Sequence, residues 1–166
     1  EAGTDIRFRT GARWVLEDNG ICNRPGQVTN LPAGKVFVLP QEQSMNGKIV
    51  IDGSWEGTLL EEPITFLVEE GLVVGISGGE MAEKLQAVLD EARVGLRPSR
   101  ANLVNTVAEF GFGMNPRAKM SGKRLEDQVV RGAAYFGFGD NSALGGSSNV
   151  GIHVRGVMLN PTIELN

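Results

Sequence analysis

The sequence predicts an α+β fold, with one β-rich domain over residues 1–166 that combines a mixed or antiparallel sheet with two to three helices. Two observations predict this class. The chain has 23 glycines among 166 residues, and glycine readily adopts the positive φ angles of tight turns between strands. Short alternating runs fill the first half of the chain, whereas helical periodicity appears only later. With 41% apolar and 22% charged residues, the chain can build an ordinary core.

The strands expected in the first half alternate apolar and polar side chains or are rich in β-branched residues. They cover residues 5–9, 13–16, 35–39, 48–52, 59–60, 64–68 and 72–76. Asn46-Gly47 and Glu69-Glu70-Gly71 are turn signals between the later strands. Trp14 and Trp55 each fall on or near a strand, which favours a place in the core over a role as a binding anchor.

Helices are expected in the second half of the chain. Glu80 to Arg93 carries apolar residues at helical spacing, with acidic residues in its first turn and an arginine in its last. Ser99 is expected to cap a shorter helix toward Ala108, and Ser121 a helix over residues 122–131. Residues 109–116, 135–138 and 152–158 predict strands, so that strands and helices mix in this half.

Composition argues against several classes of partner. The net charge is −4 and no basic block is present, so a nucleic-acid partner is not expected. No run approaches the roughly 18 apolar residues of a membrane span. The lone Cys22 permits no intramolecular disulfide, which fits a reducing compartment and predicts a cytoplasmic location. Because the chain begins at Glu1, we expect it to be processed, trimmed or cut from a longer one.

The stretch from Tyr135 to Met158 holds the only histidine of the chain, His153. A glycine- and serine-rich loop separates two strand-like runs there, which would bring polar groups from two strand ends together. A catalytic metal usually needs about three His, Asp, Glu or Cys ligands, so a metal here would require Glu42, Glu109 or Asp140. The alternative without a metal is that His153 is a partly buried imidazole, hydrogen-bonded to a neighbouring group. Nucleophile-elbow, P-loop and H-E-x-x-H motifs are absent from the sequence.

Five motifs occur in order along almost the whole chain. They are Leu31-Pro-Ala-Gly-Lys-Val-Phe, Asn46-Gly-Lys-Ile-Val-Ile-Asp-Gly, Ala108-Glu-Phe-Gly-Phe-Gly-Met-Asn-Pro, Gly139-Asp-Asn and Ile152-His-Val-x-Gly-Val-Met-x-x-Pro-Thr. In this register the chain resembles the C-terminal domain of the thermophilic-aminopeptidase family of metallopeptidases. A related branch of that family contains the iron-dependent 2,5-dihydroxypyridine dioxygenases. Full members carry a further N-terminal domain, which the resemblance implies is absent from this chain.

The resemblance also implies where the metal ligands of the family would fall. Its dinuclear site uses two glutamates, two histidines, a tyrosine and an aspartate. One glutamate falls on Glu109 and one histidine on His153, and both residue types are kept. The other four positions are changed and fall on Lys35, Tyr135, Ser142 and Arg155. The His, His and Asp ligands of the dioxygenase branch fall on Tyr135, His153 and Arg155.

Two of the changed positions carry positive charge, which physically opposes a metal ion. Lys35 and Arg155 would repel a dication by several kcal/mol, on the order of 4 kcal/mol per pair of unit charges about 4 Å apart. Both can instead neutralise Glu109. The expected site is therefore a polar pocket without metal or other cofactor, formed by Lys35, Glu109, Tyr135, Ser142, His153 and Arg155.

Three functions follow from these expectations. The first is a non-catalytic protein that binds a peptide, with Arg155 and Lys35 for a carboxylate and Glu109 for an amine. It would be similar to the peptide-binding accessory proteins of crocagin-type ribosomal peptide natural-product biosynthesis, with a precursor peptide as ligand. The second is an active metal-dependent aminopeptidase or other hydrolase with altered ligands. The third is an oligomerisation or structural domain, and by analogy with the family a homodimer or a homologous partner is expected.

Overall fold

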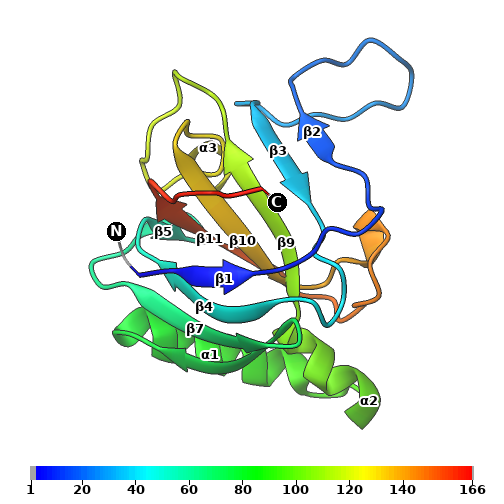
Figure 1. The fold of residues 1–166 in the computed structure, drawn as a ribbon, viewed down its shortest axis with the longest axis vertical. Coiled ribbons are helices and arrows are strands. Elements are labelled where there is room, and N and C mark those ends of the chain that lie inside the picture. Colours follow the sequence, from blue (N-terminus) through cyan, green and yellow to red (C-terminus); the bar gives the residue numbers. More distant parts are fainter. Residues whose placement is uncertain (1–2, 166) are drawn as a thin grey trace.

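The strands form two sheets in the computed structural model, which describes residues 3–165 (Figure 1). The four-stranded sheet has the order β1-β4-β7-β8 and the seven-stranded sheet the order β2-β3-β9-β10-β11-β5-β6. Neighbouring strands are antiparallel throughout both sheets. The strands are β1 (Asp5–Arg7), β2 (Leu16–Asp18), β3 (Lys35–Val38), β4 (Asn46–Ile51), β5 (Ser54–Trp55), β6 (Thr58–Leu59), β7 (Ile64–Glu69), β8 (Leu72–Ser77), β9 (Val107–Gly113), β10 (Ala133–Gly139) and β11 (His153–Leu159).

The helices are few and mostly short. They are α1 (Glu80–Arg93), α2 (Pro98–Ala101) and α3 (Arg124–Asp127), with the 3₁₀ turns η1 (Asn102–Asn105) and η2 (Ser142–Leu144). The α+β fold class predicted from the sequence is confirmed, because two antiparallel sheets and about three helices are present in residues 3–165. Only α1 is long; it lies beside β8 and η1, at the four-stranded sheet's edge (Figure 1).

The main hydrophobic core lies where the two sheets face one another. In β7, residues 64, 66 and 68 are buried and Leu67 is exposed, as expected for a strand with one face toward the core. Phe66 of β7 stacks on Phe138 of β10 with ring centroids 4.6 Å apart, and Trp55 of β5 packs against both rings. Leu85 and Leu89 of α1 join the same cluster. One face of the seven-stranded sheet is therefore committed to packing.

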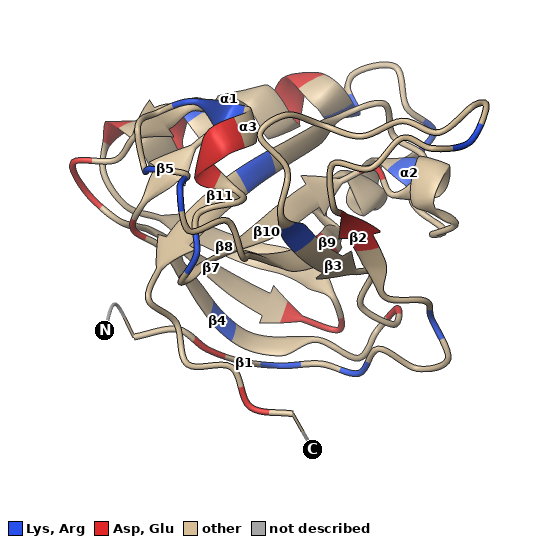
Figure 2. Cartoon of the chain, turned by 90° about the horizontal axis from the view of Figure 1, so that it is seen from above, with Lys and Arg blue, Asp and Glu red and all other residues tan. Residues whose placement is uncertain are grey.

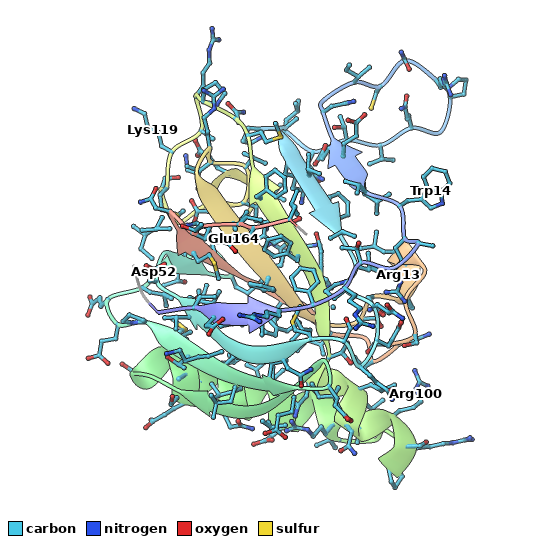
Figure 3. The ribbon with its side chains drawn as sticks, viewed as in Figure 1. Arg13, Trp14, Asp52, Arg100, Lys119 and Glu164 are labelled. Carbon is cyan, nitrogen blue, oxygen red and sulfur yellow. The ribbon has the colours of Figure 1, made fainter. Side chains whose placement is uncertain are left out.

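The structure corrects the strand predicted for residues 13–16. Strand β2 begins at Leu16, and Trp14 lies outside any strand with 86% of its surface exposed. Figure 3 shows the Trp14 side chain pointing away from the ribbon. Trp55, in contrast, is buried as expected. The two tryptophans differ because a sheet covers Trp55, whereas nothing in the described chain packs over Trp14. The Asn46-Gly47 turn signal is also wrong, since both residues lie within β4.

The predicted helix over residues 122–131 is also largely wrong. Helix α3 covers only Arg124–Asp127, and Lys123 rather than Ser121 precedes it. Val130 and Arg131 instead form bridges with Asn115 and Gly113. Pairing with β9 and the segment after it therefore ends the helix. In the same way, the helix predicted after Ser99 is split into α2 and η1, and Pro98 occupies its first turn.

Charges of both signs are spread over the described part of the chain. Figure 2 shows acidic and basic segments interspersed along helices, strands and loops. None of the helices described is long and apolar enough to cross a membrane.

Candidate functional site

The candidate site lies on the face of the seven-stranded sheet opposite its aromatic core. Gly137 of β10 pairs with Glu109 of β9 on one side and with Arg155 of β11 on the other. Residues directly opposite one another in neighbouring strands share a face, so Glu109 and Arg155 flank a residue without a side chain. The same registers place Tyr135, His153 and Lys35 on this face, opposite Gly111, Gly139 and Gly113.

Glycines make this cluster of large polar side chains possible. A Cβ atom at Gly137 would lie 2.8 Å from His153 Nε2 and 3.1 Å from the Cβ of Glu109. A Cβ at Gly111 would lie 2.6 Å from ring carbons of Tyr135. The 2.8 and 2.6 Å separations are shorter than real Cβ contacts, so a larger residue at either place would force these neighbouring side chains to move. The repeated Phe-Gly-Phe-Gly of β9 and β10 thus puts rings on the core face and open space on the site face.

Glu109 is the centre of the cluster and is fully buried. Its Oε1 accepts a hydrogen bond of 2.5 Å from the hydroxyl of Tyr135. Its Oε2 accepts hydrogen bonds from Arg155, at 3.0 Å from Nη2 and 3.3 Å from Nε. His153 Nε2 lies 3.2 Å from the same Oε2, close enough for an ion pair but not aligned as a hydrogen bond. Both carboxylate oxygens are therefore already engaged by protein groups.

These contacts keep the Glu109 carboxylate ionised despite its burial. Burial by itself would raise the pKa of Glu109, but the adjacent imidazole of His153, the charge of Arg155, the Tyr135 hydroxyl and the charge of Lys35 lower it to about 2. The pKa of Tyr135 is raised, first by burial and then by the negative charge of Glu109. Tyr135 is therefore a neutral phenol that donates a hydrogen bond to Glu109.

Lys35 is a second cation, placed on β3 behind the tyrosine ring. The side chain is buried, and its Nζ donates a 3.1 Å hydrogen bond to Oε1 of Gln128. Nζ also lies 5.2 Å from the centre of the Tyr135 ring and 5.4 Å from that of Phe37, within cation–π range. Burial lowers the pKa of the Lys35 ammonium, and the negative charge of Glu109 opposes this.

The loop after β10 fixes the orientation of His153. Nδ1 of His153 lies 2.6 Å from the backbone carbonyl oxygen of Asp140, which can only accept, so Nδ1 carries the proton. The Asp140 carboxylate accepts bonds from the backbone N–H groups of Ser142, Val150 and Gly151 and from the Ser142 hydroxyl. Burial raises its pKa, but these bonds outweigh burial and lower the pKa to about 2. Asp140 is therefore the anchor of the 140–151 loop.

An open hollow borders the cluster where β10 ends and β11 begins. It has a volume of about 360 Å³, within the usual range for small-molecule sites. His153 and Arg155, which both contact Oε2 of Glu109, also line the hollow, and their side chains are 21% and 23% exposed. Its lining is Asp140, Asn141, Ala143, Leu144, Gly151, Ile152, His153 and Arg155. The hollow thus combines an apolar wall with a cationic edge.

Most of the residues predicted for the site come together, but not all. Lys35, Glu109, Tyr135, His153 and Arg155 share the sheet face described above. Ser142 is exposed in η2, where it bonds Asp140 and has no hydrogen bond to Glu109. Glu42, weighed as a possible metal ligand, pairs instead with Arg13, and Figure 3 shows Arg13 beside the loop that contains η2.

Sequence reasoning missed three contributors to the site. Gly137 provides the space for Glu109, His153 and Arg155, and the alternation of glycine with phenylalanine in β10 was the available signal. Gln128 is the hydrogen-bond partner of Lys35, which no local pattern indicates. Asp140 was weighed only as a metal ligand, whereas an aspartate two residues before a serine is a familiar loop-capping pattern.

The donors of this cluster do not fit the iron of the dioxygenase branch. One carboxylate and one imidazole are present, and the third nearby oxygen is a neutral phenol that donates a hydrogen bond. Within residues 3–165, no group of three His, Cys, Asp or Glu side chains lies close enough to hold a metal ion. Arg155 contacts the only carboxylate of the cluster, and Lys35 lies against the Tyr135 ring on the same sheet face. The site as built is an ion-pair network rather than a ligand set.

Comparison with known proteins assigns the chain to one group. A family model described as 2,5-dihydroxypyridine 5,6-dioxygenase (NicX) matches residues 1–166. A protein of Pseudomonas putida KT2440 with the name 2,5-dihydroxypyridine 5,6-dioxygenase is 27% identical, and the alignment covers 100% of this chain and 49% of that protein. The chain therefore spans about half the length of this curated relative.

Solved structures show the same fold. The structure of the dioxygenase from Pseudomonas putida KT2440 matches with a TM-score of 0.81 and 24% identity, over 95% of this chain and 47% of the other. Wild-type AmpT from Thermus thermophilus matches with a TM-score of 0.62 and 17% identity, over 93% of this chain and 43% of the other. Both matches also cover about half of the longer chain.

Proposed function

Because the chain belongs to the 2,5-dihydroxypyridine 5,6-dioxygenase family, we propose that it serves in an enzyme that transforms a small hydroxylated aromatic ring. Its own contribution is the site where the ring binds. The carrying observation is the hollow of about 360 Å³ beside Arg155 and His153, on a chain that the family model matches from end to end.

The family match overturns the earlier expectations about activity. A non-catalytic protein that binds a peptide or precursor peptide is wrong, since the matching family and the named relative are dioxygenases. A role in ribosomal peptide biosynthesis and the alternatives of an aminopeptidase or an oligomerisation domain fall with it. The change of four metal-ligand positions therefore does not by itself imply a non-catalytic protein. A change of metal ligands shows which side chains a site contains. It does not show that the reaction of the family has been lost.

The chemistry of the hollow suits a hydroxylated ring. Arg155 uses Nε and Nη2 on Glu109, and the rest of its guanidinium can donate to a ring oxygen that is ionised or polarised. A guanidinium also stacks well on aromatic faces. Leu144 and Ile152 provide apolar surface for the ring itself. Glu109 holds the guanidinium in place, so the cation is oriented before the ring arrives.

Within this proposal, His153 orients rather than transfers protons. Its Nδ1 donates a hydrogen bond to the Asp140 carbonyl, and its Nε2 is buried 3.2 Å from Oε2 of Glu109, so Nε2 presents no surface to a substrate ring in the hollow. Any metal that the reaction requires is held by groups outside the Glu109 cluster. Dioxygen chemistry is therefore assigned to the assembled enzyme, and ring recognition to this chain.

Ring binding can be measured directly with 2,5-dihydroxypyridine as the probe. A difference-absorbance titration under anaerobic conditions should show saturable binding. Arg155→Met should weaken it about tenfold or more, since a hydrogen bond to a charged group contributes about 1.5–3 kcal/mol. Lys84→Met, which removes a cation that pairs with Glu80 on the exposed side of α1, is the control. Absence of saturable binding, or equal binding by Arg155→Met, would contradict the proposal.

The enzymatic part is tested separately by oxygen uptake. The protein should consume dioxygen in the presence of the same probe when the complete enzyme is assayed with Fe²⁺. Uptake should fall in Arg155→Met through a higher KM. An assembled enzyme that binds the ring but never consumes dioxygen would restrict the chain to ring binding and refute the enzymatic role.

Two further expectations stay predictions. Self-association as a homodimer, or assembly with a homologous partner, is testable by light scattering. A cytoplasmic location rests on the unpaired, exposed Cys22 and is testable by cell fractionation.

A further inference from the structure

We infer that protein cations replace a metal ion at Glu109. The guanidinium of Arg155 and the ammonium of Lys35 supply the positive charge there, and the cluster excludes divalent cations. This inference concerns the Glu109 cluster alone and does not depend on whether a ring binds in the neighbouring hollow.

The first support is the occupancy of the carboxylate. Oε1 of Glu109 receives the Tyr135 hydroxyl at 2.5 Å, and Oε2 receives two nitrogens of Arg155 at 3.0 and 3.3 Å. A metal ion would have to break these bonds before it could bind Glu109. Because Glu109 is fully buried, the displaced guanidinium could not simply be replaced by water at that position.

The second support is the charge that surrounds the carboxylate. Arg155 contacts Glu109 directly, and the charge of Lys35 also acts on it. The carboxylate carries one negative charge, so the two cations already exceed it. A divalent ion added to this cluster would face two like charges in a poorly hydrated setting, where repulsion is least screened. Removing positive charge should therefore be the condition for metal binding.

The third support is the way the sheet builds the cluster. Gly137 has no side chain between Glu109 and Arg155, so the guanidinium reaches Oε2 across a central strand. Gln128 accepts a hydrogen bond from Lys35 and thereby holds the ammonium close to the Tyr135 ring. Side chains from β3, β9, β10 and β11 are thus arranged around an ion pair. The space that a metal would take is filled by the ion pair itself.

Metal titration of the intact protein tests the inference without reference to activity. After treatment with a chelator, calorimetric titration with Zn²⁺ and with Mn²⁺ should show no equivalent that depends on Glu109. The thermal midpoint should also be unchanged by chelator. An equivalent that persists in Glu109→Gln lies elsewhere on the protein and agrees with the inference. One equivalent bound by the unaltered protein and lost in Glu109→Gln would overturn it.

A gain of binding gives the complementary test. Arg155→Asp removes a cation and adds a carboxylate beside Glu109 and His153. It should raise Zn²⁺ affinity at least about tenfold, the scale on which changes around a metal alter affinity, and His153→Ala in the same background should abolish the gain. If Arg155→Asp does not fold by circular dichroism, Arg155→Gln, which removes only the charge, replaces it. A folded variant with no gain in affinity would refute the charge argument, whatever the result with the ring.

Discussion

Removal of Arg155 should reveal how strongly the ion pair contributes to folding. Arg155→Met keeps much of the aliphatic stem but removes both nitrogens that donate to Glu109. Glu109 would then be a buried carboxylate with only the Tyr135 hydroxyl as hydrogen-bond donor and His153 and Lys35 as nearby basic groups. Breaking a buried pair by removing one partner costs about 3–5 kcal/mol.

The partial exposure of Arg155 places the expected cost at the low end of that range. Its side chain is 23% exposed whereas that of Glu109 is 1% exposed, so water still reaches one side of the pair. The remaining charge of Lys35 also compensates Glu109. We therefore expect a loss of about 3 kcal/mol in the free energy of unfolding.

The assay is urea denaturation at pH 7, followed by fluorescence and circular dichroism. The midpoint should move to lower urea with an unchanged m value. Lys84→Met is the control, since Lys84 pairs with Glu80 at 2.8 Å with side chains 61% and 79% exposed. A surface pair of this kind contributes about 0–1 kcal/mol. Equal costs for the two substitutions would refute the claim that the buried pair stabilises the site.

Three other perturbations follow from the same geometry. The pKa of Glu109 falls from 4.5 in the unfolded chain to about 2 in the folded protein. Because the folded pKa is lowered, ionised Glu109 contributes about 3 kcal/mol to the free energy of unfolding at pH values above the unfolded pKa. That contribution should disappear as the pH falls from 4.5 to about 2, and an equally steep acid transition in Glu109→Gln would contradict this. Gly137→Ala should cost about 1–3 kcal/mol through overpacking, whereas Gly75→Ala, where the nearest atom to a new Cβ is 3.5 Å away, should change stability little; equal costs would refute the claim. Asp140→Asn should increase hydrogen exchange at the loop amides that bond the carboxylate, and unchanged protection would show that another group anchors the loop.

The sequence predicted the regular elements best where a local pattern and the tertiary packing agree. Helix α1 has the predicted bounds, because its apolar spacing matches the side that packs and its terminal charges suit the dipole. Strands β3, β4, β7 and β8 fall close to the predicted runs, since β-branched and other apolar residues are concentrated there.

The failures occur where a distant segment decides the outcome. Val130 and Arg131 have a helix-compatible pattern, but they pair with Asn115 and with Gly113 at the end of β9, and no local signal predicts this pairing. Trp14 resembles a core residue by type and is 86% exposed, because burial depends on which element covers a side chain. The two-residue strand β5 was missed for the same reason: it exists only as a partner of β11 and β6.

The residues of the site were predicted in part from the sequence, but the function of the site was not. Family resemblance, rather than composition, indicated five residues that the sheet brings together, while Ser142 belongs to the neighbouring loop. Gly137 was not predicted as a site residue because it contributes by having no side chain. This contribution can be recognised only from the register of β9, β10 and β11. The family assignment then corrected the inferred function, since it rests on the whole chain rather than on six positions.

The most direct test of the central claim is a crystal structure of the chain with 2,5-dihydroxypyridine. We predict that the ring occupies the hollow between Leu144 and Arg155, with a ring oxygen about 2.7–3.2 Å from the guanidinium and the Arg155–Glu109 pair intact. A ring bound elsewhere on the chain, or an empty hollow at a saturating concentration of the ring, would contradict the assignment of this site.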